Sequence, residues 1–379
     1  MSTTDHVVEA APADPDAGAT DAGTDAGTDA ESTAPRRRSA PSLRWLVRPV
    51  ATAVGNMLAF VVISFLLVQL IPGDPVVTAT GGRLQGDALE AARASYGLDG
   101  SVWDQFLTYL GQLAHLDLGE SIASGRPVIE DFATRIPATL ELITTGLFFA
   151  CIVTVLLSHF VVTHPGNPVS RVLSAYARSA GALPEYVLGI AFLFVFYAVL
   201  GWAPAPSGRL DPLLIAPDDV TGFPVLDALI AGDTAAASSY VSHLVLPVIV
   251  MVVAHTPILM KSLVLGLQGA IDDPSTRFRI AAGAPRRVVL LSIYRRALPQ
   301  AVAMLGMMFG LFLGGAVVLE ALFGLGGLGQ YAVDAVNNSD IFALRSFLLV
   351  AAALCLAIYL VVEIVIALLD PRRRTGKAA

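Results

Sequence analysis

The sequence predicts an all-α integral membrane protein with six transmembrane helices, a long outer loop after the first helix and a disordered N-terminal tail. Of its 379 residues, 55% are hydrophobic and only 15% are charged, whereas soluble domains average about 25% charged residues. Six apolar stretches are long enough to cross ~30 Å of hydrocarbon as helices. These stretches comprise residues 50–70, 139–162, 183–200, 244–264, 301–323 and 347–369.

The N-terminal segment, residues 1–43, differs in composition from the rest of the chain. Its first 35 residues hold eight acidic residues, no Lys or Arg, and the short repeat DAGTDAGTDAE. Such a segment buries too little apolar surface to offset its chain entropy, so we expect a disordered cytosolic tail. The remaining predicted units are 44–137 (first helix and extracytoplasmic loop), 138–371 (the transmembrane core) and 372–379 (a basic cytosolic tail).

Lys and Arg residues gather on one side of the predicted membrane. The N-terminal tail, the 163–182 and 261–300 loops and the C-terminus together hold 18 of the 24. Because cytoplasmic loops are enriched in positive charge, we expect both termini to lie in the cytoplasm. The 72–137 loop then lies outside.

The 72–137 loop is predicted to contain an amphipathic helix. Ser101 is a suitable N-cap, and apolar residues recur after it at helical spacing from Trp103 to Leu116. This apolar stripe is expected to pack on its own protein or to lie in the membrane interface. Docking of an external partner is the alternative.

The sequence lacks the motifs of common enzyme sites. It contains no G-x-x-x-x-G-K-[ST] phosphate loop, no G-x-S-x-G nucleophile elbow and no H-x-x-x-H pair. Cys151 and Cys355 lie in apolar runs, without metal or redox spacing. We therefore expect no catalytic centre, no metal and no cofactor in this chain.

Four polar residues in the predicted spans are candidates for a solute pathway: Asn56, Gln69, His255 and Glu320. An intramembrane ionisable residue is a functional candidate by default, although most polar residues in such helices only bond to neighbouring helices. Glu320 and Glu363 lie near the ends of their spans. Ion-coupled carriers place such groups near the bilayer midplane, so this pattern argues against an ion-driven carrier.

The loop RFRIAAGAPRRVVLLSIYRRALPQ, residues 277–300, holds six arginines and no acidic residue. Gly283 is predicted to separate two short helical pieces, and Pro285 suits the first turn of the second piece. Leu298-Pro299 is predicted to end that piece before the fifth span. Physical argument leaves two interpretations open: an anchor for anionic lipid, at ~1 kcal/mol per arginine, or a docking element for another protein.

This loop resembles the EAA loop of binding-protein-dependent ABC importers, in which a Glu-Ala-Ala start is followed by a glycine and closed by Leu-Pro. Arg277 stands where the acidic start would be, as is usual in the peptide-permease branch. The resemblance implies that the loop docks into a groove of a cytosolic ATPase subunit, and that Gly283→Asp abolishes uptake while membrane insertion persists. The residues assigned to this coupling role are Arg277, Ala281, Gly283, Arg286, Arg287, Leu298 and Pro299.

The resemblance extends from about Arg44 to Arg374 and is to dipeptide/oligopeptide/nickel-type permease subunits, which implies the type I ABC importer permease fold. It rests on further segments in the family's order: IPGDP (71–75), YGLDGSVWDQFLTYLGQL (96–113), LDLGESI (116–122), RIPATLEL (135–142), LPEYVLG (183–189), LGWAPAPSG (200–208), HLVLP (243–247), GGAVVLEALFGLGGLG (314–329) and DPR (370–372).

The implied function is that of one half of a translocation pathway in a bacterial plasma (inner) membrane, working by alternating access. The implied partners are a second homologous permease, two cytosolic subunits that bind ATP and Mg, and an extracytoplasmic solute-binding protein touching the 72–137 loop; no nucleic acid is expected. Peptides are the first expected cargo, followed by nickel chelates, glutathione and other small solutes. A stand-alone carrier or channel, which would need an inverted repeat or a midplane ion site, and an intramembrane enzyme are the alternatives.

Overall fold

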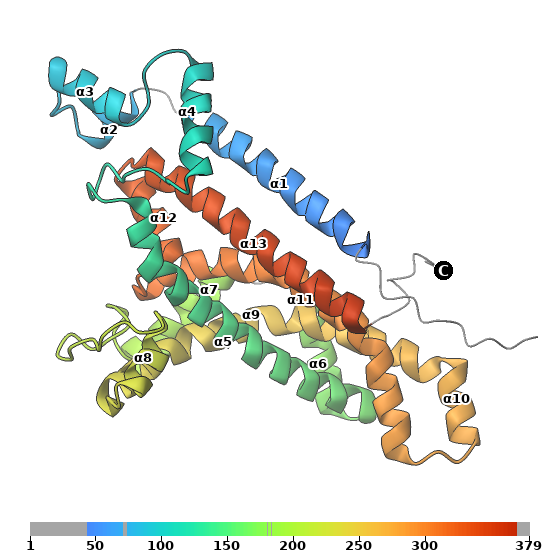
Figure 1. The fold of residues 1–379 in the computed structure, drawn as a ribbon. Helices are drawn as coiled ribbons and strands as arrows, with labels where there is room; N and C mark the ends of the chain where they lie inside the picture. The colour runs from blue at the N-terminus through green and yellow to red at the C-terminus, as the bar shows by residue number, and fades with distance from the viewer. Residues whose placement is uncertain (1–43, 71–73, 180, 183, 370–379) are drawn as a thin grey trace, which may run out of the picture. The chain divides into compact units, whose positions relative to one another are not determined.

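The computed structural model describes residues 44–70, 74–179, 181–182 and 184–369 (Figure 1). Every element in this part of the chain is helical. The predicted disordered tail, residues 71–73 of the IPGDP segment, the first residue of the LPEYVLG segment and the basic C-terminal tail lie outside the described residues.

Five described helices are long and apolar enough to cross a membrane. They are α1 (Arg44–Gln69), α5 (Val128–Thr163), α9 (Thr234–Asp272), α11 (Arg286–Phe323) and α13 (Ile341–Leu369). Each coincides with one of the six predicted spans. The remaining span, 183–200, corresponds to a shorter apolar segment formed by α7 (Glu185–Phe192) and the π-helical η1 (Leu193–Val199). The count of six full spans is therefore not confirmed.

Three of these helices extend well beyond the predicted spans. Helices α5, α9 and α11 have 36, 39 and 38 residues, which corresponds to about 54–59 Å at 1.5 Å per residue. The predicted end of a separate short helix at Leu298-Pro299 is wrong, because α11 continues through Pro299. An internal proline removes one backbone hydrogen bond. Here Ile293 and Ala297, just before it, are buried in a cluster with Leu263 and Leu267 of α9, and this packing supports the continuous helix.

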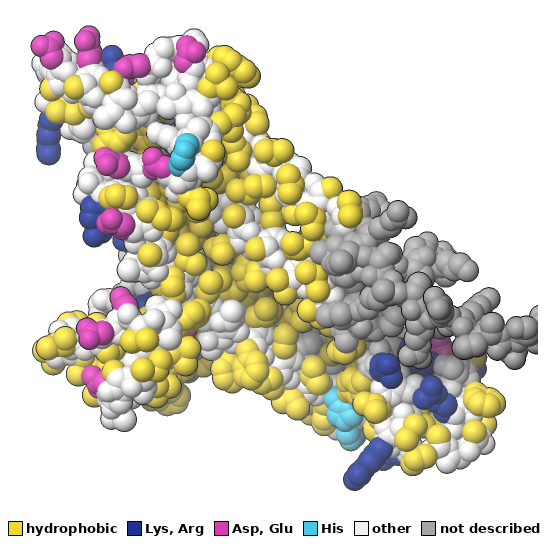
Figure 2. All heavy atoms as spheres, viewed as in Figure 1, with side chains coloured by type: hydrophobic (Ala, Val, Ile, Leu, Met, Phe, Trp, Pro, Cys, Tyr) yellow, Lys and Arg dark blue, Asp and Glu magenta, His cyan; other side chains and the backbone are white. Residues whose placement is uncertain are grey.

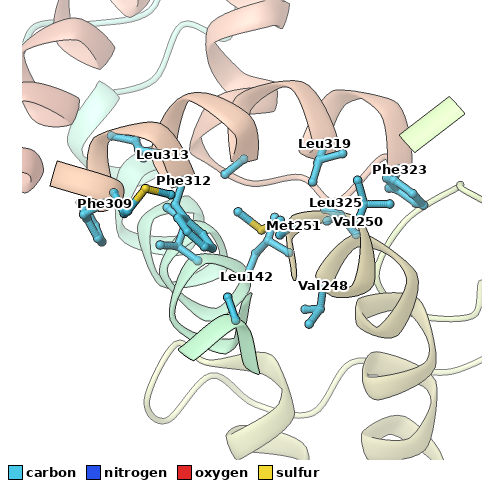
Figure 3. Packing of buried hydrophobic residues seen from close by; sticks show 14 of the residues in the cluster. Leu142, Val248, Val250, Met251, Phe309, Phe312, Leu313, Leu319, Phe323 and Leu325 are labelled. Atoms are coloured by element: carbon cyan, nitrogen blue, oxygen red, sulfur yellow. The ribbon is translucent and has the colours of Figure 1, made fainter. Parts of the chain in front are cut away.

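Helix α9 is central to the packing, because both α5 and α11 lie against it. The largest buried cluster joins these three helices, with Leu142, Met251 and Phe312 fully enclosed (Figure 3). Gly146 on α5 permits the close approach, since a Cβ there would lie 3.0 Å from the Met251 sulfur. Helix α13 packs on α11, and α1 packs on α13.

The segment between α1 and α5 contains α2 (Pro75–Ala79), α3 (Asp87–Ser95) and α4 (Val102–Ala114). The prediction of a helix capped by Ser101 is confirmed, since Ser101 and Asp104 form a reciprocal capping box. The predicted apolar stripe divides. Phe106, Leu110 and Leu113 pack with residues of α1 and α13, while Trp103, Leu107 and Leu116 remain 65%, 49% and 81% exposed.

Four shorter helices complete the described fold: α6 (Pro168–Arg178), α8 (Pro224–Ile230), α10 (Pro274–Ala281) and α12 (Leu328–Asn337). Helix α10 lies between the last residue of α9 and the first of α11. Helix α12 connects α11 to α13, and it packs beside the first turns of α5 and α13 through Phe132, Tyr331 and Ala343. The chain therefore places α10 and α12 at opposite ends of the long helices (Figure 1).

Candidate functional site

The arginine-rich segment folds as α10, a tight turn at Gly283, and the first turns of α11. The prediction of two helical pieces separated by Gly283 is confirmed. Gly283 has a φ of +72°, a left-handed conformation that L side chains rarely adopt. The turn is closed by a hydrogen bond of 3.0 Å from the Ala284 N–H to the Arg279 carbonyl. Pro285 directly precedes α11 as its N-cap residue.

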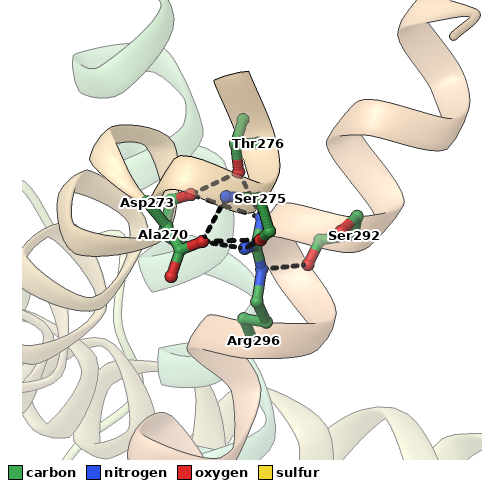
Figure 4. A network of polar contacts seen from close by, with 6 residues as sticks. All are labelled: Ala270, Asp273, Ser275, Thr276, Ser292 and Arg296. Carbon is green, nitrogen blue, oxygen red and sulfur yellow. Dashed lines mark hydrogen bonds and ion pairs between the residues drawn. The ribbon is translucent and has the colours of Figure 1, made fainter. Parts of the chain in front are cut away.

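Arg296 fastens this turn to the two long helices (Figure 4). From α11, its guanidinium pairs with the Asp273 carboxylate at 2.9 Å. It also donates to the hydroxyls of Ser275 and Thr276, and its Nε lies 3.2 Å from the Ser292 carbonyl. A fifth contact runs to the Ala270 carbonyl of α9 at 3.4 Å, so groups from α9, α10 and α11 all bind this one side chain.

Asp273 is the other anchor of the turn. Its carboxylate caps α10 by accepting from the Ser275 N–H at 2.8 Å. Hydrogen bonds from the Ser275 hydroxyl and N–H lower the pKa of Asp273, and the nearby Arg296 guanidinium lowers it further. Val289 and Ile293 of α11 are buried beside it against Leu267 and Ala270 of α9. The polar anchor and this apolar cluster together make the turn a rigid extension of α9 and α11.

The opposite side of the turn is exposed. We call it the basic loop surface, and define it by Arg277, Phe278, Arg279, Ile280, Arg286, Arg287, Leu291 and Arg295. Its five arginines form no ion pair with any described residue. Phe278 and Ile280 are 73% and 61% exposed among them. Figure 2 shows dark blue and yellow side chains gathered together around α10.

The predicted coupling residues occupy two parts of this region. Ala281 and Gly283 are exposed in the turn, beside the arginines of the basic loop surface. Leu298 and Pro299 lie about three turns further along α11, where Leu298 is exposed and Pro299 half-buried. Five of the predicted coupling residues therefore lie around one turn: Arg277, Ala281, Gly283, Arg286 and Arg287. Leu298 and Pro299 lie further along α11, away from that turn.

Two of the pathway candidates lie on α1. Asn56 is exposed. Gln69 is also exposed, and its amide donates to the side-chain oxygen of Gln105 on α4 at 2.7 Å. Neither shares a hydrogen bond or ion pair with His255 or Glu320 in the described part of the chain. The structure does not bring the four candidates together.

His255 lies in the core beside a carboxylate that the sequence analysis did not single out. Its ring stacks on Phe312, with centroids 4.1 Å apart, and its Nδ1 is 2.9 Å from the Met251 carbonyl oxygen. The Nε2 atom lies 3.9 Å from Oε2 of Glu185. The Glu185 carboxylate rests on Gly315, where a Cβ would collide with it. Glu185 stood within the LPEYVLG segment, but no local signal assigned it a partner.

Glu320 is fully buried and caps α12. Its carboxylate accepts from the N–H groups of Gly329 at 2.6 Å and Gln330 at 3.2 Å. An acceptor at this position satisfies free N–H groups and complements the positive end of the helix dipole. Gly327 and Gly329 leave no room for a Cβ beside this carboxylate and the Val317 backbone. The GLGGLG segment thus serves the approach of α12 to α11.

Glu141 and Arg209 form a second pair that sequence reasoning missed, joining α5 to the loop after η1. Their Oε2 and Nη1 atoms are 3.7 Å apart, and the Val225 N–H donates to Glu141 at 3.1 Å. Burial lowers the pKa of the Arg209 guanidinium below its usual value, and the carboxylates of Glu141 and Glu320 offset only part of this shift. Glu141 also lines a mainly apolar cavity of about 510 Å³ between α5, α8 and α9.

Two family profiles match the sequence over nearly all of the described helices. The profile described as "Binding-protein-dependent transport system inner membrane component" matches residues 143–375, and the N-terminal profile of the same membrane components matches residues 42–143. The junction at residue 143 falls within α5.

Individual relatives match over most of their length. The chain is 30% identical to the di/tripeptide transport system permease protein DppB of Pseudomonas aeruginosa, over 88% of this chain and 99% of that protein. It is 32% identical to the probable D,D-dipeptide transport system permease protein DdpB of Escherichia coli, over 83% and 93%. The dipeptide transport system permease protein DppB of Escherichia coli is 27% identical over 88% and 100%.

The matches span the long apolar helices and the exposed loop alike. The chain therefore belongs to the family of binding-protein-dependent transport system inner membrane components, as a multi-pass permease subunit of an ABC importer.

Proposed function

We propose that this permease subunit imports peptides or similar small solutes, and that it couples to cytosolic ATPase subunits through the basic loop surface. The coupling proposal rests on one observation: five arginines, none of them paired with a carboxylate of a described residue, surround exposed apolar residues on a turn that Arg296 bonds to α10 and α11. The cargo proposal rests on the relatives, which are named as di/tripeptide and dipeptide transport permeases.

The length of α9 favours a protein partner over a lipid anchor at this surface. The apolar span predicted within α9 ends at residue 264, and α10 begins at Pro274. Ten helical residues correspond to about 15 Å, whereas the headgroup layer on each side of the hydrocarbon is only about 5–7 Å thick. The turn therefore extends past the headgroups into the aqueous phase, where a second protein can reach it.

The proposed orientation places α10 in the cytoplasm and the α2–α4 segment outside. The excess of Lys and Arg in the 261–300 loop supports this orientation. In this arrangement, two ATPase subunits hold ATP and Mg below the membrane, a second permease completes the pathway, and a solute-binding protein delivers cargo from outside. The rigid turn would transmit closure of the ATPases to α9 and α11 as a body.

Purification of the tagged chain from its own membrane in mild detergent, with mass spectrometry of the bound proteins, tests this proposal. The expected result is a second permease together with two nucleotide-binding proteins. Arg286→Gln combined with Arg287→Gln is expected to reduce recovery of the nucleotide-binding proteins and to leave the second permease bound. Arg83→Gln, an exposed arginine of the 72–137 loop, is the matched control.

Two results would contradict the proposal. One is a chain that is recovered alone and moves solute when reconstituted alone, which is the behaviour of a self-sufficient carrier. The other is recovery of the nucleotide-binding proteins with the double variant that stays complete at every salt concentration. A contact made by exposed charges would instead weaken as salt is added, because salt screens such pairs.

A further inference from the structure

A second polar site lies at the end of the helices opposite α10. A cavity of about 260 Å³ opens between the 116–127 loop, the first turns of α5, helix α12 and the turn before α13. Its lining is mainly polar, in contrast to the apolar cavity beside Glu141. We call it the α12 pocket, and define it by Ser121, Arg126, Asp131, Arg135, Tyr331, Asp334 and Asp340.

Most charged groups of the α12 pocket are already satisfied. Arg126 pairs with Asp131 at 2.7 Å. The Asp340 carboxylate accepts from the Ser121 hydroxyl at 2.6 Å and from the Ala123 N–H at 3.0 Å, and its other oxygen caps α13. These contacts join the 116–127 loop to α5 and to the turn between α12 and α13, and they form part of the wall of the cavity.

Two charged groups in the wall have no such partner. The Arg135 guanidinium lies over the Tyr331 ring, 4.9 Å from its centroid, and pairs with no carboxylate of the described chain. The Asp334 carboxylate accepts no hydrogen bond from any described residue. Arg135 and Asp334 come from different helices and do not pair with each other. Within the part of the chain that the structure describes, the cavity thus presents one cation and one anion that have no ion-pair partner.

This arrangement complements a small zwitterion. A guanidinium over an aromatic ring keeps N–H groups available for a carboxylate, and arginine can bind a carboxylate bidentately. A carboxylate, in turn, accepts hydrogen bonds from an ammonium group. The volume lies just below the ~300 Å³ at which sites for drug-sized ligands begin. An extended dipeptide, whose charged ends lie within about 7 Å of each other, is of suitable size.

We propose that the α12 pocket binds short zwitterionic peptides, with Arg135 receiving the terminal carboxylate and Asp334 the terminal ammonium group. Its role as an entry subsite rests on the proposed import of peptides, and on the orientation that places α12 outside. The binding itself requires neither ATP nor the ATPase subunits. A failure of the coupling proposal would therefore leave this proposal standing, and the converse also holds.

Equilibrium dialysis of the purified full chain in lipid nanodiscs against radiolabelled Ala-Ala tests the proposal. We expect saturable binding with a Kd of about 1 mM or below, and weaker competition by N-acetyl-Ala-Ala and by Ala-Ala-amide than by Gly-Gly. Arg135→Gln is expected to lower the affinity for Ala-Ala at least about tenfold and to abolish the preference for a free carboxylate. Asp334→Asn is expected to erase the preference for a free ammonium group instead.

The controls use exposed charges of the same loop system outside the pocket. Arg83→Gln and Asp99→Asn are expected to leave the affinity for Ala-Ala and both preferences unchanged. Arg135→Lys retains the charge and loses the fork, so an intermediate affinity is expected. If Arg135→Lys binds Ala-Ala, the loss of binding in Arg135→Gln reflects the lost charge and not a general failure to fold.

Three outcomes would overturn the proposal. The first is absence of Ala-Ala binding to the unaltered chain at millimolar concentration. The second is unchanged end preferences in both Arg135→Gln and Asp334→Asn. The third is stronger displacement by O-phosphoethanolamine than by Gly-Gly, which would assign the pocket to a zwitterionic lipid headgroup rather than to a peptide.

Discussion

The basic loop surface and the helical core both carry charged residues, but these residues are exposed on the loop surface and buried beside partners in the core. Around α10, five arginines are exposed and form no ion pair with a described residue. In the core, Glu185 lies beside His255, Glu141 lies beside Arg209, and Glu320 caps α12. The exposed group has one sign of charge, and the buried group mixes both signs.

The difference follows from the cost of burying charge. An ion removed from water costs several kcal/mol unless a partner or hydrogen bonds compensate it, so core charges occur with partners that fix helices to one another. An exposed arginine remains solvated without a partner, and it is available to another protein. We therefore expect changes in the core to affect stability first, and changes on the loop surface to affect transport without affecting stability.

Gly283→Asp is the change with the largest expected effect on transport. Nothing lies within 4 Å of a Cβ added at Gly283, so the fold is expected to persist. Aspartate, like asparagine, is among the residues that tolerate the left-handed conformation, but it introduces an acid among the arginines that would contact the ATPase. We expect uptake in cells to be abolished, while membrane insertion and thermal stability in detergent stay unchanged.

Gly283→Asn is its matched control, because asparagine tolerates the left-handed conformation and carries no charge. It is expected to retain much more uptake. Normal uptake with Gly283→Asp would remove the loop from the transport mechanism. Equal loss in both variants would show that backbone conformation, rather than charge, is what matters.

Arg296→Ala is expected to loosen the turn without unfolding the core. Loss of its hydrogen bonds to Asp273 and Thr276 lowers the local stability of the turn. Hydrogen exchange of the amides in residues 273–284 should accelerate by up to about fivefold, as expected for a largely exposed ion pair that solvent screens. Arg295→Ala, at an exposed neighbour that forms no ion pair with a described residue, should leave exchange unchanged. Equal acceleration in the two variants would exclude the Arg296 network as the anchor.

Gly315→Ala tests the core side of the comparison. The added methyl collides with the Glu185 carboxylate, and overpacking of this kind typically costs about 1–3 kcal/mol. We expect a lower Tm in detergent, with partial recovery when Glu185→Ala is added. Gly314→Ala on the same helix meets nothing within 4 Å and should be neutral. A Tm that is equal for the two glycine variants would show that Glu185 does not rest on Gly315.

The smallest expected effect is that of pH on the turn. The pKa of Asp273 is lowered in the folded chain by its hydrogen bonds with Ser275 and by Arg296. A carboxylate with a depressed folded pKa contributes stability above its unfolded value, and that stability is lost as pH falls through the folded pKa. Protection of α10, corrected for intrinsic exchange, should therefore be constant from about pH 8 to pH 5 and weaken only below about pH 4.

Asp273→Asn provides the reference for this experiment, because it should show no pH dependence at the first turn of α10. Weakening between pH 7 and pH 5 in the unaltered chain would contradict the assignment of Asp273 as the titrating anchor.

Local patterns in the sequence predicted the features that depend on neighbouring residues. The capping box at Ser101, the turn at Gly283 and the apolar course of five spans all arise from backbone preferences and hydropathy within a few residues. The end of a helix at Pro299 was mispredicted by the same kind of reasoning. Packing of Ile293 and Ala297 against α9 involves residues far away in the chain and outweighs the local effect of the proline.

The sequence by itself determined that this chain spans a membrane, belongs to an importer family and carries an unusually basic loop. Hydropathy, charge distribution and motif order are all properties of the linear chain. Only the tertiary structure decided which charges have partners. Glu185 lies beside His255, and Glu141 lies beside Arg209. Arg135 and Asp334 line one cavity and form no ion pair with each other. These relations join helices that are distant in sequence, and they follow from how the helices pack, which no local pattern encodes.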